Sequence, residues 1–178
     1  DASENERRSD EVVEVRIAAP APGEGRWGVE RAGLVTALLE DGLLHLDRVV
    51  PSVVGAPALP SLSAPLEVGR VIDAEVRLTG SAPVVVVLTL CERDDPGGCW
   101  NGSVAARDDR FHEAVGALVA DAAPILGSAV PATSPESPSA DPYAVLLLGR
   151  AAAALYRIGP VASPTSADPR AGCRARAR

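Results

Sequence analysis

The sequence VVVVLTL at residues 84–90, followed by DDPGG at 94–98 and CWNGSVAA at 99–106, decides how this chain folds. Runs of β-branched residues favour strands, whereas Asp, Pro and Gly in close succession favour a turn. The three stretches together predict a β-hairpin. The first strand is apolar on both faces, so we expect a central strand that is covered on both sides.

Two cysteines, Cys91 and Cys99, flank the turn of this hairpin. Residues opposite each other in an antiparallel pair have Cβ atoms roughly 4.5–5.5 Å apart, close to what a disulfide needs. We therefore predict a Cys91–Cys99 disulfide, with two buried free thiols as the alternative, and Cys173 is left over. Such a bridge fits an oxidising compartment, and three cysteines at these spacings match no usual zinc site.

The residues before the hairpin alternate between strand and helix patterns. Residues 13–17 alternate apolar and polar side chains and predict a strand. A stripe at helical spacing predicts a helix over about 27–41, ended by Gly42 in the C′ position. Residues 44–49 predict a second strand, and the Pro- and Ser-rich segment 51–65 predicts a loop.

The remaining elements complete a mixed α and β pattern. Residues 66–72 predict a short helix or the approach to a strand, and residues 74–78 predict a strand. After the hairpin, Asp108 or Asp109 is expected to cap a helix that runs to about Leu126. The order β-α-β-(α)-β-β-β-α predicts an α/β fold of the α+β class, with a mixed sheet of about five strands packed with helices.

Composition divides the chain into five segments. Residues 1–10 are polar and charged and are expected to be disordered. Residues 11–127 form the α/β domain, and 128–141 form a Pro- and Ser-rich linker. Residues 142–158 form an apolar helix, and 159–178 form a loose tail rich in arginine.

The apolar helix at 142–158 is expected to begin at Pro142, with Asp141 as its N-cap. A helix this apolar cannot stand free in water and must pack on its own domain, on a second copy or on a partner. We expect its own domain, because an intramolecular surface is present at a high effective concentration. The apolar stripe expected to make this contact comprises Ala144, Leu147, Leu148, Ala151, Ala154, Leu155 and Ile158. The candidate interaction residues are Leu147, Leu148 and Leu155.

Charge and composition narrow the classes of function. All 17 basic residues are arginine, which points to a GC-rich bacterial genome, and the net charge is −7. An acidic surface repels phosphate, so we expect no nucleic-acid partner. No apolar run approaches the roughly 20 residues that span a bilayer. Because the chain begins at Asp1 without a signal segment, we expect a mature or excised fragment, and any membrane tether would lie outside it.

Candidate catalytic and metal-binding groups are sparse. His112 lies near Asp108, Asp109 and Glu113, but no nucleophile motif accompanies it, so we interpret it as structural. His45 is interpreted in the same way. The acidic turn formed by Glu92, Asp94 and Asp95 has too few oxygen ligands for calcium. We therefore expect no catalytic residues, no metal and no cofactor.

The hairpin and its flanks resemble the amino-terminal domains of TolB-like proteins over about residues 11–127. In those domains a short helix leads into a strand, and a long strand, a turn of the form D-x-x-x-G-x-x-x-W, a returning strand and a helix follow. The matching segments are RVIDAEVRLTG at 70–80, 84–90, 92–98 with Trp100, and 108–126, preceded by 26–50. Here the turn carries cysteines and the Gly-x-Asp approach to the third strand is altered. The resemblance implies an α/β sandwich that serves as an assembly module in envelope and signalling proteins, without catalytic residues.

The segment YAVLLLGRAA at 143–152 resembles the first helix of a tetratricopeptide-type repeat. With the first resemblance, it implies a non-catalytic interaction or assembly module of a bacterial cell-envelope protein, located in the periplasm or secreted. Its partner would be another envelope protein or a second copy. The alternative is a small hydrolase or ligand-binding domain with a site near the 51–65 loop. A cleft that brings His45, His112 and acidic residues together would favour the alternative.

Overall fold

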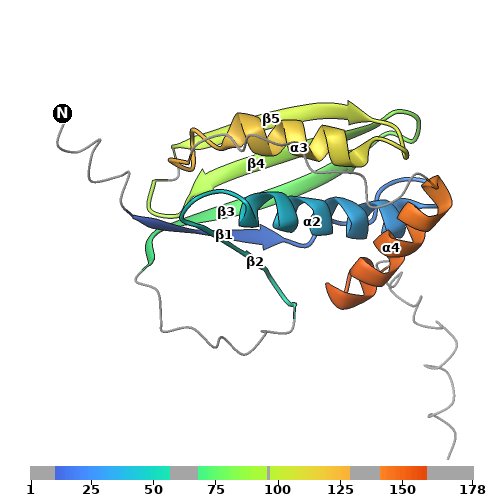
Figure 1. The fold of residues 1–178 in the computed structure, drawn as a ribbon, viewed down its shortest axis with the longest axis horizontal. Helices are drawn as coiled ribbons and strands as arrows, with labels where there is room; N and C mark the ends of the chain where they lie inside the picture. Colours follow the sequence, from blue (N-terminus) through green and yellow to red (C-terminus); the bar gives the residue numbers. More distant parts are fainter. Residues whose placement is uncertain (1–10, 57–67, 96, 129–140, 160–178) are drawn as a thin grey trace, which may run out of the picture.

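The computed structural model of the chain describes residues 11–56, 68–95, 97–128 and 141–159. Five strands form one mixed sheet in the order β2-β1-β3-β4-β5, and three helices accompany it (Figure 1). The fold class and the five-stranded mixed sheet predicted from the sequence are confirmed. The strands are β1 (Val12–Ala18), β2 (Val49–Val53), β3 (Val68–Thr79), β4 (Val84–Glu92) and β5 (Cys99–Ala106). The helices are α2 (Gly28–Leu44), α3 (Phe111–Ala122) and α4 (Pro142–Leu155).

The sheet has a parallel half and an antiparallel half. β1 pairs in parallel with β2 on one side and with β3 on the other, whereas β3, β4 and β5 follow one another as an antiparallel meander. α2 joins β1 to β2, and α3 follows β5 (Figure 1). Strands β4 and β5 are the two strands of the predicted hairpin.

Both α2 and α3 cover the same face of the sheet, and they lie beside each other on it (Figure 1). Burial alternates along β1 and β4 as it does in a sheet with one covered face. Val86 and Leu88 are buried under the helices, whereas Val85 and Val87 are only half-buried on the other face. The prediction that this strand is covered on both sides is therefore wrong, because no helix of the described residues packs on the second face.

The boundary between α2 and β2 differs from the prediction. The expected strand at 44–49 is wrong, because α2 continues to Leu44 and β2 begins at Val49 and includes Pro51. Gly42 does not end the helix but lies inside it, against α3. A Cβ atom on Gly42 would come within 3.0 Å of Val119 Cγ2, so the small residue allows the two helices to approach.

Two further boundaries are corrected. The segment 66–72 was expected to form a short helix or the approach to a strand. Its described residues, 68–72, belong to β3, which begins at Val68. α3 begins after Arg110 without a side-chain cap, so neither Asp108 nor Asp109 has the expected role. Asp108 instead accepts two hydrogen bonds from Arg31 of α2, at 2.7 and 2.9 Å. This pair ties the segment before α3 to α2.

The most closely packed contact between helices joins α4 to α2. A Cβ atom on Gly33 would lie 2.1 Å from the carbonyl oxygen of Gly149, and one on Gly149 would lie 2.2 Å from the carbonyl oxygen of Glu30. Ala153 lies in the same crossing, on the next turn of α4. The two backbones therefore touch without side chains between them, which only glycine allows.

Polar groups in the C-terminal half of α4 hold it on α2, and a side chain caps its N-terminal end. Arg150 donates two hydrogen bonds to the buried carboxylate of Glu30, at 3.0 and 2.7 Å. The Tyr156 hydroxyl donates a hydrogen bond to Glu40. Asp141 caps the helix by accepting from the backbone N–H of Tyr143, as predicted. These bonds leave the Glu30 carboxylate paired rather than isolated in the contact.

The helix docks on its own domain, as expected, but Ile158 is the only fully buried residue of the expected stripe. Helical spacing puts the contact residues on the side opposite Leu147, Leu148 and Leu155. The small residues of α4 allow a closer approach than leucines would, so the closely packed side is the one that lies against α2. The buried residues of α4 and its end are Val145, Leu146, Gly149, Ala152, Ala153, Tyr156 and Ile158.

Substitution of Gly149 tests the crossing. In an unconstrained helix, Gly→Ala raises stability by up to about 1 kcal/mol. For Gly149→Ala we expect the opposite sign, a loss of about 1–3 kcal/mol, because the new methyl group overlaps the backbone of α2. Chemical denaturation of the two proteins measures the difference. Ala151→Leu, at an exposed position of the same helix, should change stability by no more than about 0.5 kcal/mol. A more stable Gly149→Ala variant would contradict the close crossing.

The contact between Tyr156 and Glu40 predicts a loss of stability in alkali. Burial, followed by the hydrogen bond to Glu40, raises the pKa of the Tyr156 phenol well above its ordinary value of 10.0. The unfolded chain then releases this proton at a lower pH than the folded chain, so the free energy of unfolding falls as the pH rises above 10.0. Urea unfolding between about pH 8 and pH 11 measures the slope.

The Tyr156→Phe variant should lose this part of the slope, whereas Tyr143→Phe, at an exposed position, should keep it. Equal slopes in the wild type and in Tyr156→Phe would show that the contact with Glu40 does not form in solution.

Candidate interaction surface

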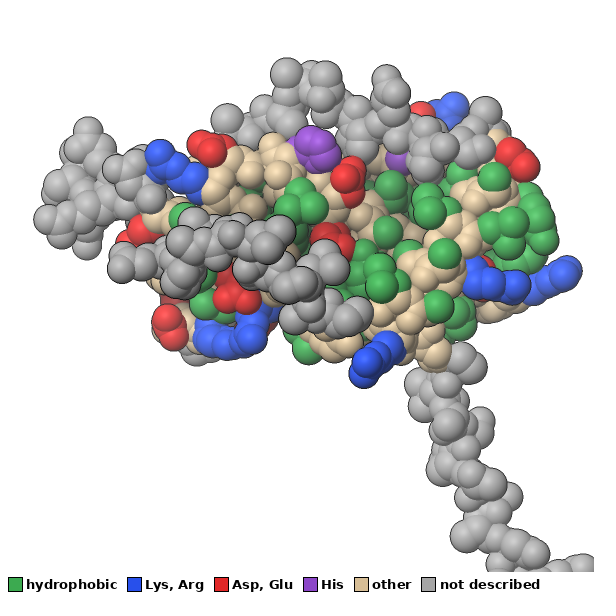
Figure 2. All heavy atoms as spheres, turned by 60° about the horizontal axis from the view of Figure 1, so that its bottom comes forward, with side chains coloured by type: hydrophobic (Ala, Val, Ile, Leu, Met, Phe, Trp, Pro, Cys, Tyr) green, Lys and Arg blue, Asp and Glu red, His purple; other side chains and the backbone are tan. Residues whose placement is uncertain are grey.

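The side of α4 that faces away from α2 carries large apolar side chains. Tyr143 is 58 % exposed, Leu147 and Leu148 are each 44 % exposed, and Leu155 is 55 % exposed. These four residues define the α4 outer face, and the smaller exposed residues Ala151 and Ala154 lie between them. Hydrophobic side chains are frequent on the part of the molecule where α4 lies (Figure 2). The three leucines are the interaction residues predicted from the sequence.

The α4 outer face carries no charge. Arg150 is the one charged residue within α4, and it is drawn toward Glu30 at the border with α2. At its N-terminal end the face continues onto Trp27, which meets Tyr143 edge to face with ring centroids 6.4 Å apart. Arg26 in turn lies 5.0 Å from the Trp27 ring. The uncharged surface is thus bordered by arginines.

Sequence reasoning missed the residues by which α4 is held. The signal was available: Gly149 and Ala153 are four residues apart, and small residues at this spacing form a smooth stripe on one side of a helix. Gly33 in α2 likewise has the small residue Ala37 four positions later, but which two stripes meet could be found only from the crossing itself. As a result, the leucine stripe was taken for the docking side.

An open depression of about 660 Å³ lies at one end of the sheet. The turn between β3 and β4 and the segment between β5 and α3 form its walls, and Arg31 and Pro142 complete it. Arg31 already donates hydrogen bonds from Nε and Nη2 to the two carboxylate oxygens of Asp108. Ser81 is a lining residue, but among the described lining residues no histidine or cysteine accompanies it. The depression therefore presents a closed ion pair rather than an activated nucleophile.

Each of the two histidines lies beside an acidic residue that is close to it in the sequence. His45 Nδ1 lies 2.7 Å from the backbone oxygen of Asp41, at the exposed end of α2. His112 Nε2 lies 3.9 Å from the carboxylate of Glu113. In the part of the chain that the structure describes, no group of three or more His, Cys, Asp or Glu side chains could hold a metal ion.

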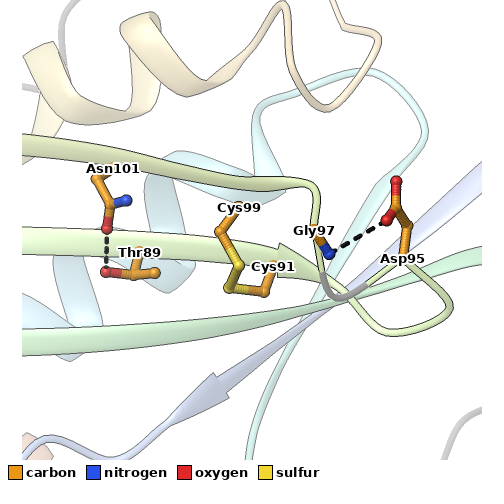
Figure 3. The surroundings of a disulfide bond; sticks show 6 residues. All are labelled: Thr89, Cys91, Asp95, Gly97, Cys99 and Asn101. Atoms are coloured by element: carbon orange, nitrogen blue, oxygen red, sulfur yellow. Dashed lines mark hydrogen bonds between the residues drawn. A yellow bond between two sulfur atoms is a disulfide. The ribbon is translucent and has the colours of Figure 1, made fainter.

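The predicted disulfide joins Cys91 of β4 to Cys99 of β5 (Figure 3). The turn residue Asp95 accepts a hydrogen bond from the backbone N–H of Gly97 at 3.2 Å, which is a common way to stabilise a tight turn. Glu92 accepts two hydrogen bonds from Arg70, at 3.0 and 3.2 Å. The Asp95 carboxylate thus stabilises the turn, and the Glu92 carboxylate forms an ion pair with Arg70.

No protein-family model matches the chain, and no curated protein matches it significantly. None of the helices in the described ranges is long and apolar enough to cross a membrane. The predicted loop at 51–65 is wrong at its start, because residues 51–53 belong to β2, and from residue 57 it lies outside the described residues. The expected disordered segment at 1–10, the linker at 129–140 and the tail from 160 with Cys173 also lie outside them.

The disulfide can be tested by thiol labelling. Without reductant, only Cys173 of the three cysteines should react, and a Cys173→Ser variant should not react at all. Reduction should lower the free energy of unfolding by roughly 2–3 kcal/mol, because the bridge restricts the unfolded chain. Labelling of all three cysteines in the non-reduced protein would contradict the bridge.

Proposed function

We propose that this chain is a non-catalytic interaction module of a bacterial cell-envelope protein, and that the α4 outer face binds its partner. The observation that carries the proposal is the exposure of Tyr143, Leu147, Leu148 and Leu155 on a helix whose opposite side is already fixed on α2. Clustered apolar surface of this kind is a frequent mark of protein–protein contact. The partner would present an apolar surface of its own, such as the stripe of an amphipathic helix.

Rigidity of α4 supports this role. The crossing at Gly149, the pair between Arg150 and Glu30, and the N-cap at Asp141 fix its position before a partner arrives. A surface that is already ordered loses less conformational entropy on binding. The leucines therefore need not be ordered by the partner.

Two observations support the envelope as the site of action. The disulfide between Cys91 and Cys99 is consistent with an oxidising compartment. The resemblance of residues 11–127 to TolB-like amino-terminal domains, which implies an assembly module of envelope and signalling proteins, also motivates the proposal. Residues 143–152 resemble the first helix of a tetratricopeptide-type repeat, and the α4 outer face would suit the packing of a further helix.

Introduction of negative charge on the apolar surface tests the proposal. Leu147→Asp together with Leu148→Asp should leave stability within about 1 kcal/mol of the wild type, because both side chains are outside the contact with α2. Partner binding should weaken at least about tenfold, since the new carboxylates would have to be buried against an apolar partner. Ala117→Asp, at an exposed position of α3, is the matched control and should keep full binding.

Photo-crosslinking identifies the partner surface directly. A photoreactive residue at position 148 should give a defined crosslinked species in intact envelopes, and the same residue at position 117 should not. The Leu147→Asp substitution should abolish the species formed from position 148. Crosslinking that is equal at both positions, or unaffected by Leu147→Asp, would contradict the proposal.

A further inference from the structure

A second surface that could bind a protein is the edge strand β5. It lies at the opposite edge of the sheet from β2 and away from α4 (Figure 1). Exposed edge strands are usually protected by charges, by proline or by shortness. β2, at the other edge, has five residues and includes Pro51. β5 has eight residues, CWNGSVAA, with neither a charge nor a proline. Within the described residues, no strand pairs with its outer side.

The disulfide shows which backbone groups of β5 face outward. Opposite residues of an antiparallel pair alternate between hydrogen-bonded pairs with Cα atoms about 5.5 Å apart and non-hydrogen-bonded pairs about 4.5 Å apart. The Cα atoms of Cys91 and Cys99 are 4.2 Å apart, so they form a non-hydrogen-bonded pair. By alternation, the N–H and C=O groups of Asn101, Ser103 and Ala105 point away from β4. These groups form the outer edge.

We propose that β5 pairs in an antiparallel manner with β5 of a second copy, about a two-fold axis at Gly102. This register pairs Asn101 with Ser103 of the second copy, and both residues present outward-facing backbone groups. On the helix side it sets the half-buried Trp100 against the half-buried Val104 of the second copy. Aromatic and β-branched side chains in opposed positions stabilise antiparallel pairs. The inference goes beyond the proposed function, because it uses a different surface and a different occupant.

Gly102 suits a position on the two-fold axis. A Cβ atom at this residue would lie 2.4 Å from the Trp100 ring, so the ring lies across the glycine on the helix side of the sheet. Trp100 is thereby held near the middle of β5 and close to the axis. Gly102 would face its own copy across a close, non-hydrogen-bonded pair, with no side chains to separate the strands.

The side chains on the open face are also complementary. Thr89 donates a hydrogen bond to Asn101 Oδ1 at 2.7 Å, which fixes the amide and leaves its N–H groups to donate to Ser103 of the second copy (Figure 3). Beyond the strand ends, the exposed Arg107 of one copy comes beside the exposed turn that carries Asp94 and Asp95 of the other. The axis repeats each of these contacts, as expected for a two-fold dimer.

Paired substitutions test both the edge and the register. Asn101→Lys with Ser103→Lys sets lysine against lysine at both symmetric pairs, and should weaken dimerisation by about tenfold or more. Asn101→Glu with Ser103→Lys sets glutamate against lysine in the same pairs and should restore it. Both variants change the same two exposed positions, so each is the folding control of the other. Analytical ultracentrifugation of the full chain over a concentration series gives the dissociation constants.

Each outcome decides the proposal. Dimerisation that is lost in the lysine pair and regained in the glutamate–lysine pair supports it. A wild type that stays monomeric throughout the series overturns it and leaves the edge to an extended peptide of another protein. A dimer that survives the lysine pair but is lost in the variant with Leu147→Asp and Leu148→Asp would assign self-association to the α4 outer face. Loss without rescue would overturn the register.

Discussion

The direct contact between the backbones of α2 and α4 at Gly33 and Gly149 is the constraint on which much of the remaining structure depends. It makes α2 a helix enclosed on two sides, by the sheet and by α4. Glu30, which would otherwise face water, is buried as a result, and the polar Thr36 is buried on the same helix. Their hydrogen bonds to Arg150 and to the backbone oxygen of Ala32 keep these groups satisfied.

The two faces of the sheet have different chemistry, and this difference confines the apolar surface. One face is sealed by α2 and α3, while the other carries charged side chains of β1 and β3 beside the half-buried Val85, Val87 and Thr89 of β4. Arg93 is paired with Asp73 there, and Arg77 with Glu75. An open face of this kind stays hydrated and does not invite a second layer. Exposed apolar surface is therefore concentrated elsewhere, notably on α4.

Local patterns were sufficient to predict the class of fold but not the packing of its helices. Alternation in β1, the turn chemistry of the hairpin and the cysteine spacing all act between near neighbours, so the sequence alone indicated β1, the two hairpin strands and the disulfide. The extent of α2 was missed because Gly42 suits both a helix end and a close contact with Val119. Choosing between these roles requires the position of α3. Asp108 was likewise expected as a cap, and its partner Arg31 lies 77 residues away.

The candidate surface shows the same limit more sharply. The leucines of α4 stood out by size and hydrophobicity and were predicted as interaction residues, and the structure leaves all three exposed. Which side of the helix would be buried depended on how near a second backbone could come, and hydrophobicity does not measure that distance. The side with small residues is the buried one, because two backbones in direct contact make more atomic contacts per unit of area than a ridge of leucines over a groove.

The separation between α2 and α4 along the chain also matters while the protein is being made. Glu30 meets Arg150 across 120 residues, so α2 is synthesised long before the helix that covers it. At about 5–20 residues per second, the ribosome needs on the order of ten seconds to add that length. During this interval the nascent sheet can form, but the outer side of α2 stays uncovered and Glu30 lacks its partner. A nascent chain with this uncovered helix is a natural client for chaperones, and a chain cut short before α4 would carry the same exposed surface as a mark for proteolysis.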